Sequence, residues 1–354
     1  METKEAKSLK ERMTELRAST DITLPLKRYV MVAIDGRAFS RMVKNKFEKP
    51  FSDTFIGYMN EVAKYVCKNV EGCKFAYAQS DEITFVLTDF DTETTNAFFG
   101  NRLTKILSII PAMATAKYNQ LILADLCDTP CSNSDLKQMI LDTKLAEFDC
   151  KAWSVNNLSD VYSYYLWRQI DCIRNSKHQT AQTWLSHKVL NGLDTDEQIK
   201  LLLDEKGIDW NSFEDYKKYG RFIYKEKEMF HNDKLNTDYE RSVWKVHDGF
   251  PIMKDGKEKF LALGVIPDIN VVRPDEVVPA ELEDEIAKYV NDEDTIIRKS
   301  SIFQLDLGYD SMDMVELMFG LEEKYDFKWD EDKGIRIITV QDLIRELAEH
   351  GIKY

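Results

Sequence analysis

The sequence lacks the long apolar runs and paired cysteines that would mark a membrane-spanning or secreted protein. No stretch approaches eighteen uninterrupted apolar residues, and the charged run Met1–Arg17 has no apolar segment of the signal-peptide type. The six cysteines form no CxxC pair and match no zinc-binding spacing, and the five histidines suggest no ligand set. These absences predict a cytoplasmic protein with no membrane span, whose thiols are reduced and lie in or near a core.

Basic charge is scarce at one end of the chain. The 354 residues have a net charge of −14, but residues 270–354 carry 22 Asp and Glu against 10 Lys and Arg, which leaves only −2 for residues 1–269. This length favours two domains, and the prolines of 270–280 indicate a linker. We therefore predict domains at 1–269 and 281–354, of which only the second is strongly acidic.

Residues 1–269 contain a regular order of predicted elements. They are strands at 29–34 and 145–155, a hairpin at 74–88, helices at 51–70, 94–118, 159–190 and 194–206, and a strand-rich, irregular stretch at 220–265. In chain order, the elements from residue 29 to residue 155 are strand, helix, strand, strand, helix and strand, where the hairpin supplies the two middle strands. This order is the split βαβ pattern of ferredoxin-like folds. Polymerase and cyclase palms use this layout, so we predict an α+β fold with a palm-like βαββαβ domain.

Acidic side chains follow two strands of that pattern. Asp35 follows the first strand, and Asp81 and Glu82 form the tip of the hairpin. In the palm layout these ends lie side by side, so Asp35 and Asp81 would hold the divalent cations of a two-metal nucleotidyl transfer. Gly36 allows its carbonyl to approach as a further ligand, and Glu82 would bind or orient a ligand. Each motif alone is also a common solvated turn.

Basic residues near these turns suit phosphate binding. Arg37 and the amides after it can hold phosphates, and Lys49 adds a point charge for a triphosphate. The chemistry lies in four segments: Ile34–Arg41, Lys49-Pro50, Tyr77–Glu82 and Leu166–Cys172. These segments resemble the tRNA-His guanylyltransferase family, and the resemblance covers residues 5–270 in order.

The resemblance implies an enzyme with two Mg²⁺ ions that adds nucleotides in the 3′–5′ direction to a tRNA 5′ end activated with ATP or as a triphosphate. It implies GTP and ATP as substrates, a homo-tetramer, and metals held by Asp35, the Gly36 carbonyl and Asp81. It also implies contacts to the nucleotide from the following residues: Asp35, Gly36, Arg37, Ala38, Phe39, Ser40, Lys49, Ser80 and Asp81.

One segment departs from the family pattern. Members that act on tRNA-His have His-Ile-Asn after an Asp-Cys pair, whereas this chain has Ile173 at the histidine position, followed by Arg174 and Asn175. This version resembles the bacterial and archaeal relatives, which look like template-directed enzymes that repair truncated tRNA 5′ ends. We therefore favour repair with any Watson–Crick-matched nucleotide over strict addition of one guanosine.

Two arginines and several aromatic residues of 159–190 have alternative interpretations. Under the repair hypothesis Arg168, Arg174 and Asn175 bind tRNA phosphate. The alternative is that the arginines form ion pairs on a helix surface, with Asp160 or Asp171. Tyr164, Tyr165 and Trp167 can stack on bases, but such a group is more often part of a core.

The acidic end of the chain contains a second pattern. A short helix is expected at 281–289, and Asp310 is a natural N-cap for an amphipathic helix with Met314, Val315, Met318 and Leu321 inward. Residues 281–354 resemble an acyl carrier protein, a small helical bundle, with the attachment motif present as Asp310-Ser311-Met312-Asp313. The resemblance implies a 4′-phosphopantetheine arm on Ser311, a phosphopantetheinyl transferase and an acyl-transfer partner. The alternative is a plain helix cap.

The sequence therefore predicts a tRNA 5′-end nucleotidyltransferase joined to an acyl-carrier-like domain. One alternative is a cyclase-like palm that condenses nucleotides without RNA. A second alternative, of a different class, is a carrier or interaction protein that binds RNA and has lost catalysis. The intact carboxylates argue against the second alternative.

Overall fold

The structure is a computed structural model that describes residues 8–18, 20–42, 46–91, 95–232, 236–252, 256–270, 276–290, 295–304, 306–329 and 337–352. The chain forms two compact units, residues 1–267 and 268–354, and each is described by itself. The predicted linker at 270–280 falls partly on residues 271–275, which lie outside the described residues. None of the described helices is long and apolar enough to cross a membrane.

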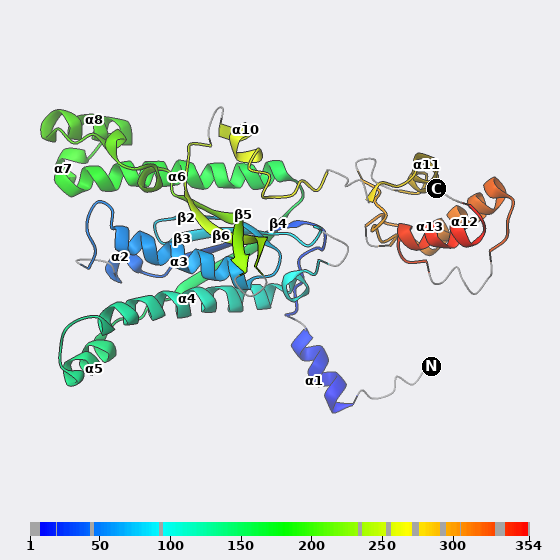
Figure 1. The fold of residues 1–354 in the computed structure, drawn as a ribbon, viewed down its shortest axis with the longest axis horizontal. Coiled ribbons are helices and arrows are strands. Elements are labelled where there is room, and N and C mark those ends of the chain that lie inside the picture. The colour runs from blue at the N-terminus through cyan, green and yellow to red at the C-terminus, as the bar shows by residue number, and fades with distance from the viewer. Residues whose placement is uncertain are drawn as a thin grey trace, which may run out of the picture. The chain divides into compact units, whose positions relative to one another are not determined.

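The first unit is built on a six-stranded sheet in which every neighbouring pair is antiparallel (Figure 1). The strands are β1 Tyr29–Gly36, β2 Cys73–Gln79, β3 Glu82–Leu87, β4 Phe148–Val155, β5 Arg221–Asn232 and β6 Thr237–Asp248. Their order across the sheet is β4-β1-β3-β2-β5-β6. The prediction of a mixed α+β fold is confirmed.

Helices lie on both faces of this sheet (Figure 1). The helices of the unit are α1 Leu9–Ala18, α2 Phe39–Met42, α3 Asp53–Asn69, α4 Leu103–Cys127, α5 Asn133–Asp142, α6 Leu158–Trp184, α7 His187–Leu190, α8 Thr195–Lys206, α9 Asp215–Lys218 and α10 Gly256–Leu261, with 3-10 turns η1 Phe98–Asn101 and η2 Trp210–Ser212.

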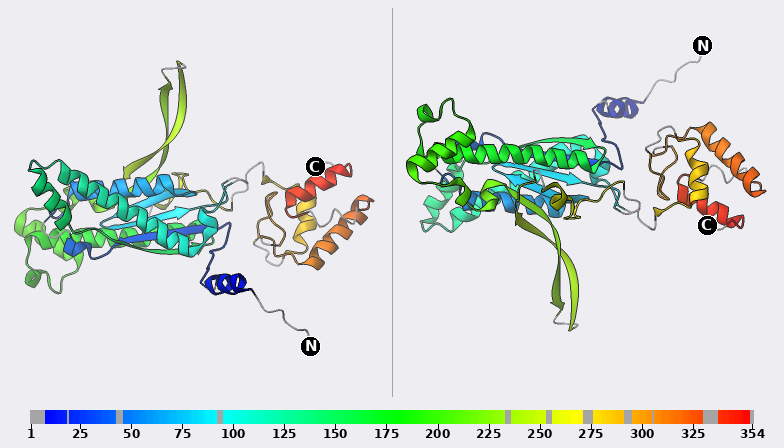
Figure 2. Two further views of the ribbon diagram at one scale, coloured as in Figure 1. Left: turned by 90° about the horizontal axis from the view of Figure 1, so that it is seen from below. Right: turned by 90° about the horizontal axis from the view of Figure 1, so that it is seen from above.

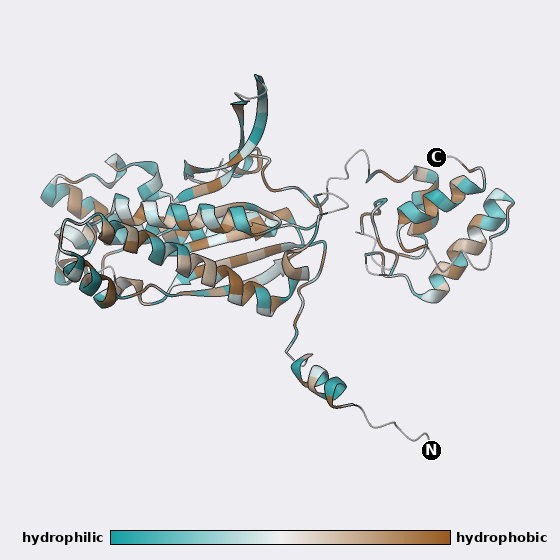
Figure 3. Cartoon of the chain, turned by 60° about the horizontal axis from the view of Figure 1, so that its bottom comes forward, coloured by the Kyte–Doolittle hydropathy of each residue, from teal (hydrophilic) through white to brown (hydrophobic). Residues whose placement is uncertain are grey.

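The two faces of the sheet have separate cores because strand side chains alternate. Val32 and Ile34 of β1 belong to the core formed with α3 and α4. On the other face Phe75 and Tyr77 of β2 contact Tyr165 of α6. Figure 3 shows apolar residues concentrated on the strands and on the helices that pack against them. Each fully buried large side chain contributes roughly 1.5–3 kcal/mol.

Several predicted boundaries were wrong. The helix expected at 94–118 runs from Leu103 to Cys127, because left-handed backbone at Phe99 (φ 51°) and Gly100 (φ 61°) separates η1 from it. Strand β1 continues to Gly36, since its last residues pair with both β3 and β4. The stretch at 220–265 contains a long hairpin, β5–β6, which extends the sheet and projects from it (Figure 2).

The prediction that the cysteine thiols lie in or near a core was correct for only some of the six cysteines. Cys67, Cys73 and Cys172 are buried, whereas Cys127 and Cys131 are exposed. The exposed pair follows from the longer α4, which carries residue 127 past the core to the end of the helix.

The second unit is a small helical unit with its own core. Its helices are α11 Ala280–Ala287, α12 Ser311–Tyr325 and α13 Val340–Glu349. Asp310 caps α12 as predicted, through hydrogen bonds from the amides of Met312 and Asp313. The predicted inward face needs one correction, because Val315 is 44% exposed and Leu317 is buried in its place.

Candidate active site

The register of the sheet brings the predicted acidic residues together. Asp35 of β1 lies directly opposite Glu82 of β3, and the Gly36 amide donates to the Asp81 carbonyl at 3.1 Å. On its other side Asp35 lies opposite Asp149 of β4. Neighbouring strands are only about 4.8 Å apart. Asp35, Glu82 and Asp149 therefore lie next to one another across three strands at the end of β1. The sequence analysis did not single out Asp149, although it lies within the strand predicted at 145–155.

The charges of this group are poorly compensated. Burial, and then the neighbouring charges of Asp81 and Asp149, raise the pKa of Asp35. Burial raises the pKa of Asp81 as well, although the Ser80 hydroxyl donates to its carboxylate at 3.0 Å. A cation bound between Asp35 and Asp81 would relieve this repulsion.

The donor set fits Mg²⁺, which takes oxygen ligands and uses one or two protein carboxylates with water and phosphate. No group of three or more His, Cys, Asp or Glu side chains within the described residues is arranged as a complete metal cage. A site of two carboxylates that is completed by substrate phosphate is therefore the form that these residues support.

Gly36 has a steric reason to be glycine. A Cβ at this position would meet the ring of Phe39 at 2.4 Å. Phe39 is itself a core residue, packed against Tyr118 and Phe148. The tight turn between β1 and α2 therefore depends on the missing side chain, and Ala38 within it adopts a left-handed φ of 56°.

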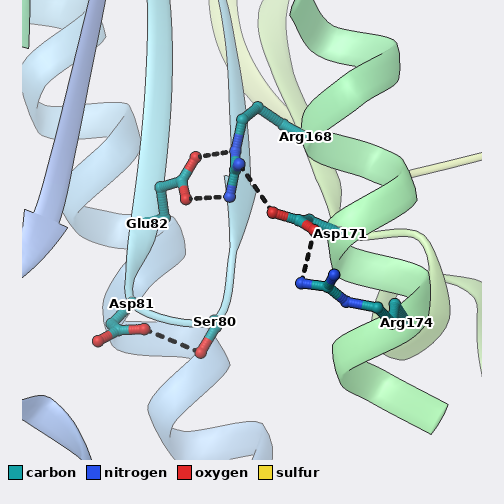
Figure 4. A network of polar contacts seen from close by, with 6 residues as sticks. All are labelled: Ser80, Asp81, Glu82, Arg168, Asp171 and Arg174. Carbon is teal, nitrogen blue, oxygen red and sulfur yellow. Dashed lines mark hydrogen bonds and ion pairs between the residues drawn. The ribbon is translucent and has the colours of Figure 1, made fainter. Parts of the chain in front are cut away.

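Glu82 is held by Arg168 of α6 (Figure 4). The Nε and Nη2 atoms of Arg168 each donate to one Glu82 oxygen at 2.7 Å, and its Nη1 donates to Asp171 at 2.9 Å. The Arg168 and Glu82 side chains are 12% and 19% exposed. Both Glu82 oxygens are therefore engaged, and this fork aligns the strand that follows Asp81.

Arg174 lies on the outside of the same network (Figure 4). It pairs with Asp171 at 2.8 Å and is 62% exposed. Both arginines thus contact Asp171, which is one of the two ion-pair partners that the sequence analysis considered. The other, Asp160, forms hydrogen bonds with Asn157 at the start of α6. The partner of Arg168 across the sheet, Glu82, was not foreseen, and tRNA phosphate binding by these residues stays a prediction.

A pocket of about 280 Å³ lies beside the acidic turn. Five of its lining residues were predicted to bind nucleotide or tRNA, namely Phe39, Lys49, Ser80, Asp81 and Asn175. Its other lining residues include Phe47, Phe51, Tyr216, Lys217 and Arg221, which the sequence analysis did not identify. Aromatic walls, cations and amides together form a suitable lining for a nucleotide.

The remaining predicted residues lie outside this pocket. Arg37 is exposed and pairs with Glu147 at 2.8 Å, and Ser40 belongs to α2, with its side chain outside the described residues. Ser311 is the first residue of α12 and is exposed in the second unit.

Comparison with known proteins assigns the first unit to a family. The tRNA-His guanylyltransferase family model matches residues 10–156. A bacterial tRNA(His) guanylyltransferase-like protein, solved in complex with ATP, is 31% identical, with a TM-score of 0.60, over 73% of this chain and 99% of that chain. The chain therefore belongs to the tRNA-His guanylyltransferase family.

Two further relatives match this chain over most of their own length. The tRNA(His) guanylyltransferase of Saccharomyces cerevisiae is 26% identical over 223 residues, 60% of this chain and 88% of that protein. An uncharacterized protein of Acanthamoeba polyphaga mimivirus is 27% identical over 266 residues, 71% of this chain and 88% of that protein.

Proposed function

We propose that the protein is a magnesium-dependent nucleotidyltransferase that adds nucleotides in the 3′–5′ direction to the 5′ end of tRNA. The observation that carries the proposal is the register that sets Asp35 beside the Asp81 turn, next to the pocket lined by Lys49 and Ser80. Membership of the family supports tRNA as the substrate. The ATP and GTP complexes of the bacterial relatives support nucleoside triphosphates as donors.

The residues of the site have distinct roles in this proposal. Asp35, the Gly36 carbonyl and Asp81 hold the metals, and Lys49 and Arg37 bind phosphate. Bound Mg²⁺ supplies stabilisation of negative charge on the phosphoryl group and orients the reacting oxygens. Glu82 is a positioning residue, because the Arg168 fork occupies both of its oxygens. Catalysis then rests on positioning and charge, with no covalent protein nucleophile.

Repair of truncated tRNA is the form of this activity that we propose. Ile173 occupies the position where members that act on tRNA-His have histidine, and Asn175, two residues on, lines the pocket. The test is to incubate the protein with labelled nucleoside triphosphates and tRNAs of several identities that lack their first 5′ nucleotide. Incorporation of whichever nucleotide pairs with the opposite strand is expected.

The same assay separates the alternatives. Guanosine added only to tRNA-His would contradict repair, and nucleotide condensation without RNA would indicate the cyclase-like activity. Tight tRNA binding without any incorporation would indicate an RNA-binding protein that has lost catalysis. Intact tRNA with a complete 5′ end serves as the control, since its first nucleotide is already present and leaves nothing to repair.

For the second unit we propose an acyl-carrier-like role with 4′-phosphopantetheine on Ser311. Ser311 is exposed at the start of α12, directly after the Asp310 cap. Beside it on the same helix Met312 and Phe319 are both 64% exposed, which suits an apolar docking face for a modifying or acyl-transfer enzyme. Acidic residues on the same helix, such as Glu316 and Glu323, would attract a basic partner.

Treating the protein with coenzyme A and a phosphopantetheinyl transferase tests this role. A mass increase of one phosphopantetheine group is expected for the wild type and none for Ser311→Ala. The variant is a fair control because Asp310, not Ser311, accepts the capping hydrogen bonds. Unmodified wild-type protein, both in this reaction and from its native host, would leave Ser311 as part of a plain helix cap.

The homo-tetramer and the cytoplasmic location stay predictions from the sequence.

A further inference from the structure

Arg221 is a buried cation without a charge partner. It is the first residue of β5 and is only 3% exposed. Its Nε donates to Oδ1, the side-chain amide oxygen of Asn60 in α3, at 3.0 Å, whereas its Nη2 is buried with no hydrogen-bond partner. Within the part of the chain that the structure describes, no carboxylate lies within ion-pairing distance of Arg221.

Neighbouring cations form ion pairs with carboxylates, whereas Arg221 forms none among the described residues. Lys217 pairs with Asp53 and Glu214 at 3.3 and 3.2 Å, and Lys218 pairs with Asp215 at 3.1 Å. A buried charge is costly unless it is paired and hydrogen-bonded, and arginine does not escape this cost by losing its proton. Burial lowers the pKa of the Arg221 guanidinium, in line with that cost.

The location of Arg221 indicates what compensates it. Arg221 lines the pocket of about 280 Å³ that also contains Asp81. Lys49 and Lys217 line it as well, and the side-chain amides of Asn175 and Gln179 add donors. The lining also includes the carboxylates of Glu48 and Asp81. Its cations and neutral donors are groups of the kind that bind an anion with several oxygens.

We propose that Arg221 forms an anion subsite of this pocket that receives the polyphosphate of a bound nucleotide. The guanidinium fork matches two phosphoryl oxygens, and Lys49 and Lys217 add point charges. A nucleotide held here would have its phosphates in the same pocket as Asp81, one of the residues that would hold a metal ion. The inference rests on the proposed function for the identity of the ligand, but not for the presence of an anion site.

Calorimetric titration of the full chain with inorganic tripolyphosphate in EDTA tests the subsite without tRNA or metal. We expect Arg221→Gln to weaken tripolyphosphate binding about 10- to 100-fold, the usual effect of losing a hydrogen bond to a charged group. The same loss is expected for GTP with Mg²⁺. Arg221→Lys keeps a cation in similar volume, and it should recover part of the affinity.

Two matched variants separate anion binding from structural support. Asn60→Ala removes the side-chain hydrogen bond of Arg221 and keeps its charge, so tripolyphosphate affinity should stay within about twofold. Lys218→Met removes a neighbouring buried cation that does not line the pocket, and it should likewise leave the affinity unchanged. Equal losses in Asn60→Ala and Arg221→Gln would overturn the proposal, because Arg221 would then act through packing.

Other outcomes also decide the matter. Unchanged tripolyphosphate affinity in both Arg221 variants overturns the proposal. A loss of affinity seen only for guanosine, or only for tRNA with a 5′-phosphate, also overturns it. If Arg221→Gln fails to fold, Arg221→Lys still carries the test. An inactive wild type that binds tripolyphosphate through Arg221 would reject the proposed function and keep the anion subsite.

Discussion

Replacing Asp35 or Asp81 with asparagine is expected to lower the rate of nucleotide addition by at least about 10³-fold. A catalytic metal provides several kcal/mol of transition-state stabilisation, and each 1.4 kcal/mol is tenfold in rate. Both side chains are needed because no larger ligand group exists among the described residues. Single-turnover addition to a 5′-truncated tRNA in saturating Mg²⁺ measures the effect, and chelation of Mg²⁺ in the wild type should produce the same loss.

The same variants are expected to fold at least as well as the wild type. The folded chain raises the pKa of Asp35 and Asp81, so it binds protons more tightly than the unfolded chain does. Stability therefore falls as the pH rises from the unfolded pKa through the higher folded pKa, and above the folded pKa the ionised carboxylates destabilise the fold. Asparagine removes this cost at neutral pH, so calorimetry should find an unchanged or higher Tm.

A matched acid at a distance from the turn provides the control. Asp91 pairs with Lys74 at 2.7 Å and follows β3 at its other end. Asp91→Asn should therefore keep full activity. If both Asp35→Asn and Asp81→Asn add nucleotides at a near-normal rate, these acids are ordinary solvated residues of surface turns. The two-metal mechanism would then be rejected.

Local patterns in the sequence were sufficient for the acidic turn and for the α12 cap. The hairpin β2–β3 was foreseen because its two runs pair through a short tip, and pairing of β1 with β3 follows from the order of the elements. Asp310 was foreseen as a cap because a helix cap depends on residues within one turn. These features need no knowledge of distant contacts.

Long-range contacts account for what the sequence did not reveal. Glu82 and Arg168 are 86 positions apart, and nothing near either residue indicates the pair. The β5–β6 hairpin alternates charged residues such as Lys227 and Glu240, which pair across strands and leave no apolar run to recognise. Arg221 stands at the start of that hairpin, and its burial arises only when α3 and the pocket assemble around it.

Replacing Arg168 with methionine is expected to lower the free energy of unfolding by about 3 kcal/mol, at the low end of the cost of breaking a buried ion pair. Methionine fills most of the volume but leaves the Glu82 carboxylate, 19% exposed, without its two hydrogen bonds. Arg174→Met is the matched control, because Arg174 is 62% exposed and its loss should cost less than about 1 kcal/mol. Calorimetry of the full chain measures both.

A double variant identifies the cause of the loss. Arg168→Met combined with Glu82→Gln removes the unpaired charge, so it should recover most of the stability lost in Arg168→Met. If Arg168 served mainly to bind tRNA phosphate, its replacement would weaken tRNA binding and leave the Tm unchanged, and Glu82→Gln would rescue nothing. Recovery of stability together with reduced nucleotide addition would instead assign the fork to holding β3, and with it the Asp81 turn, in place.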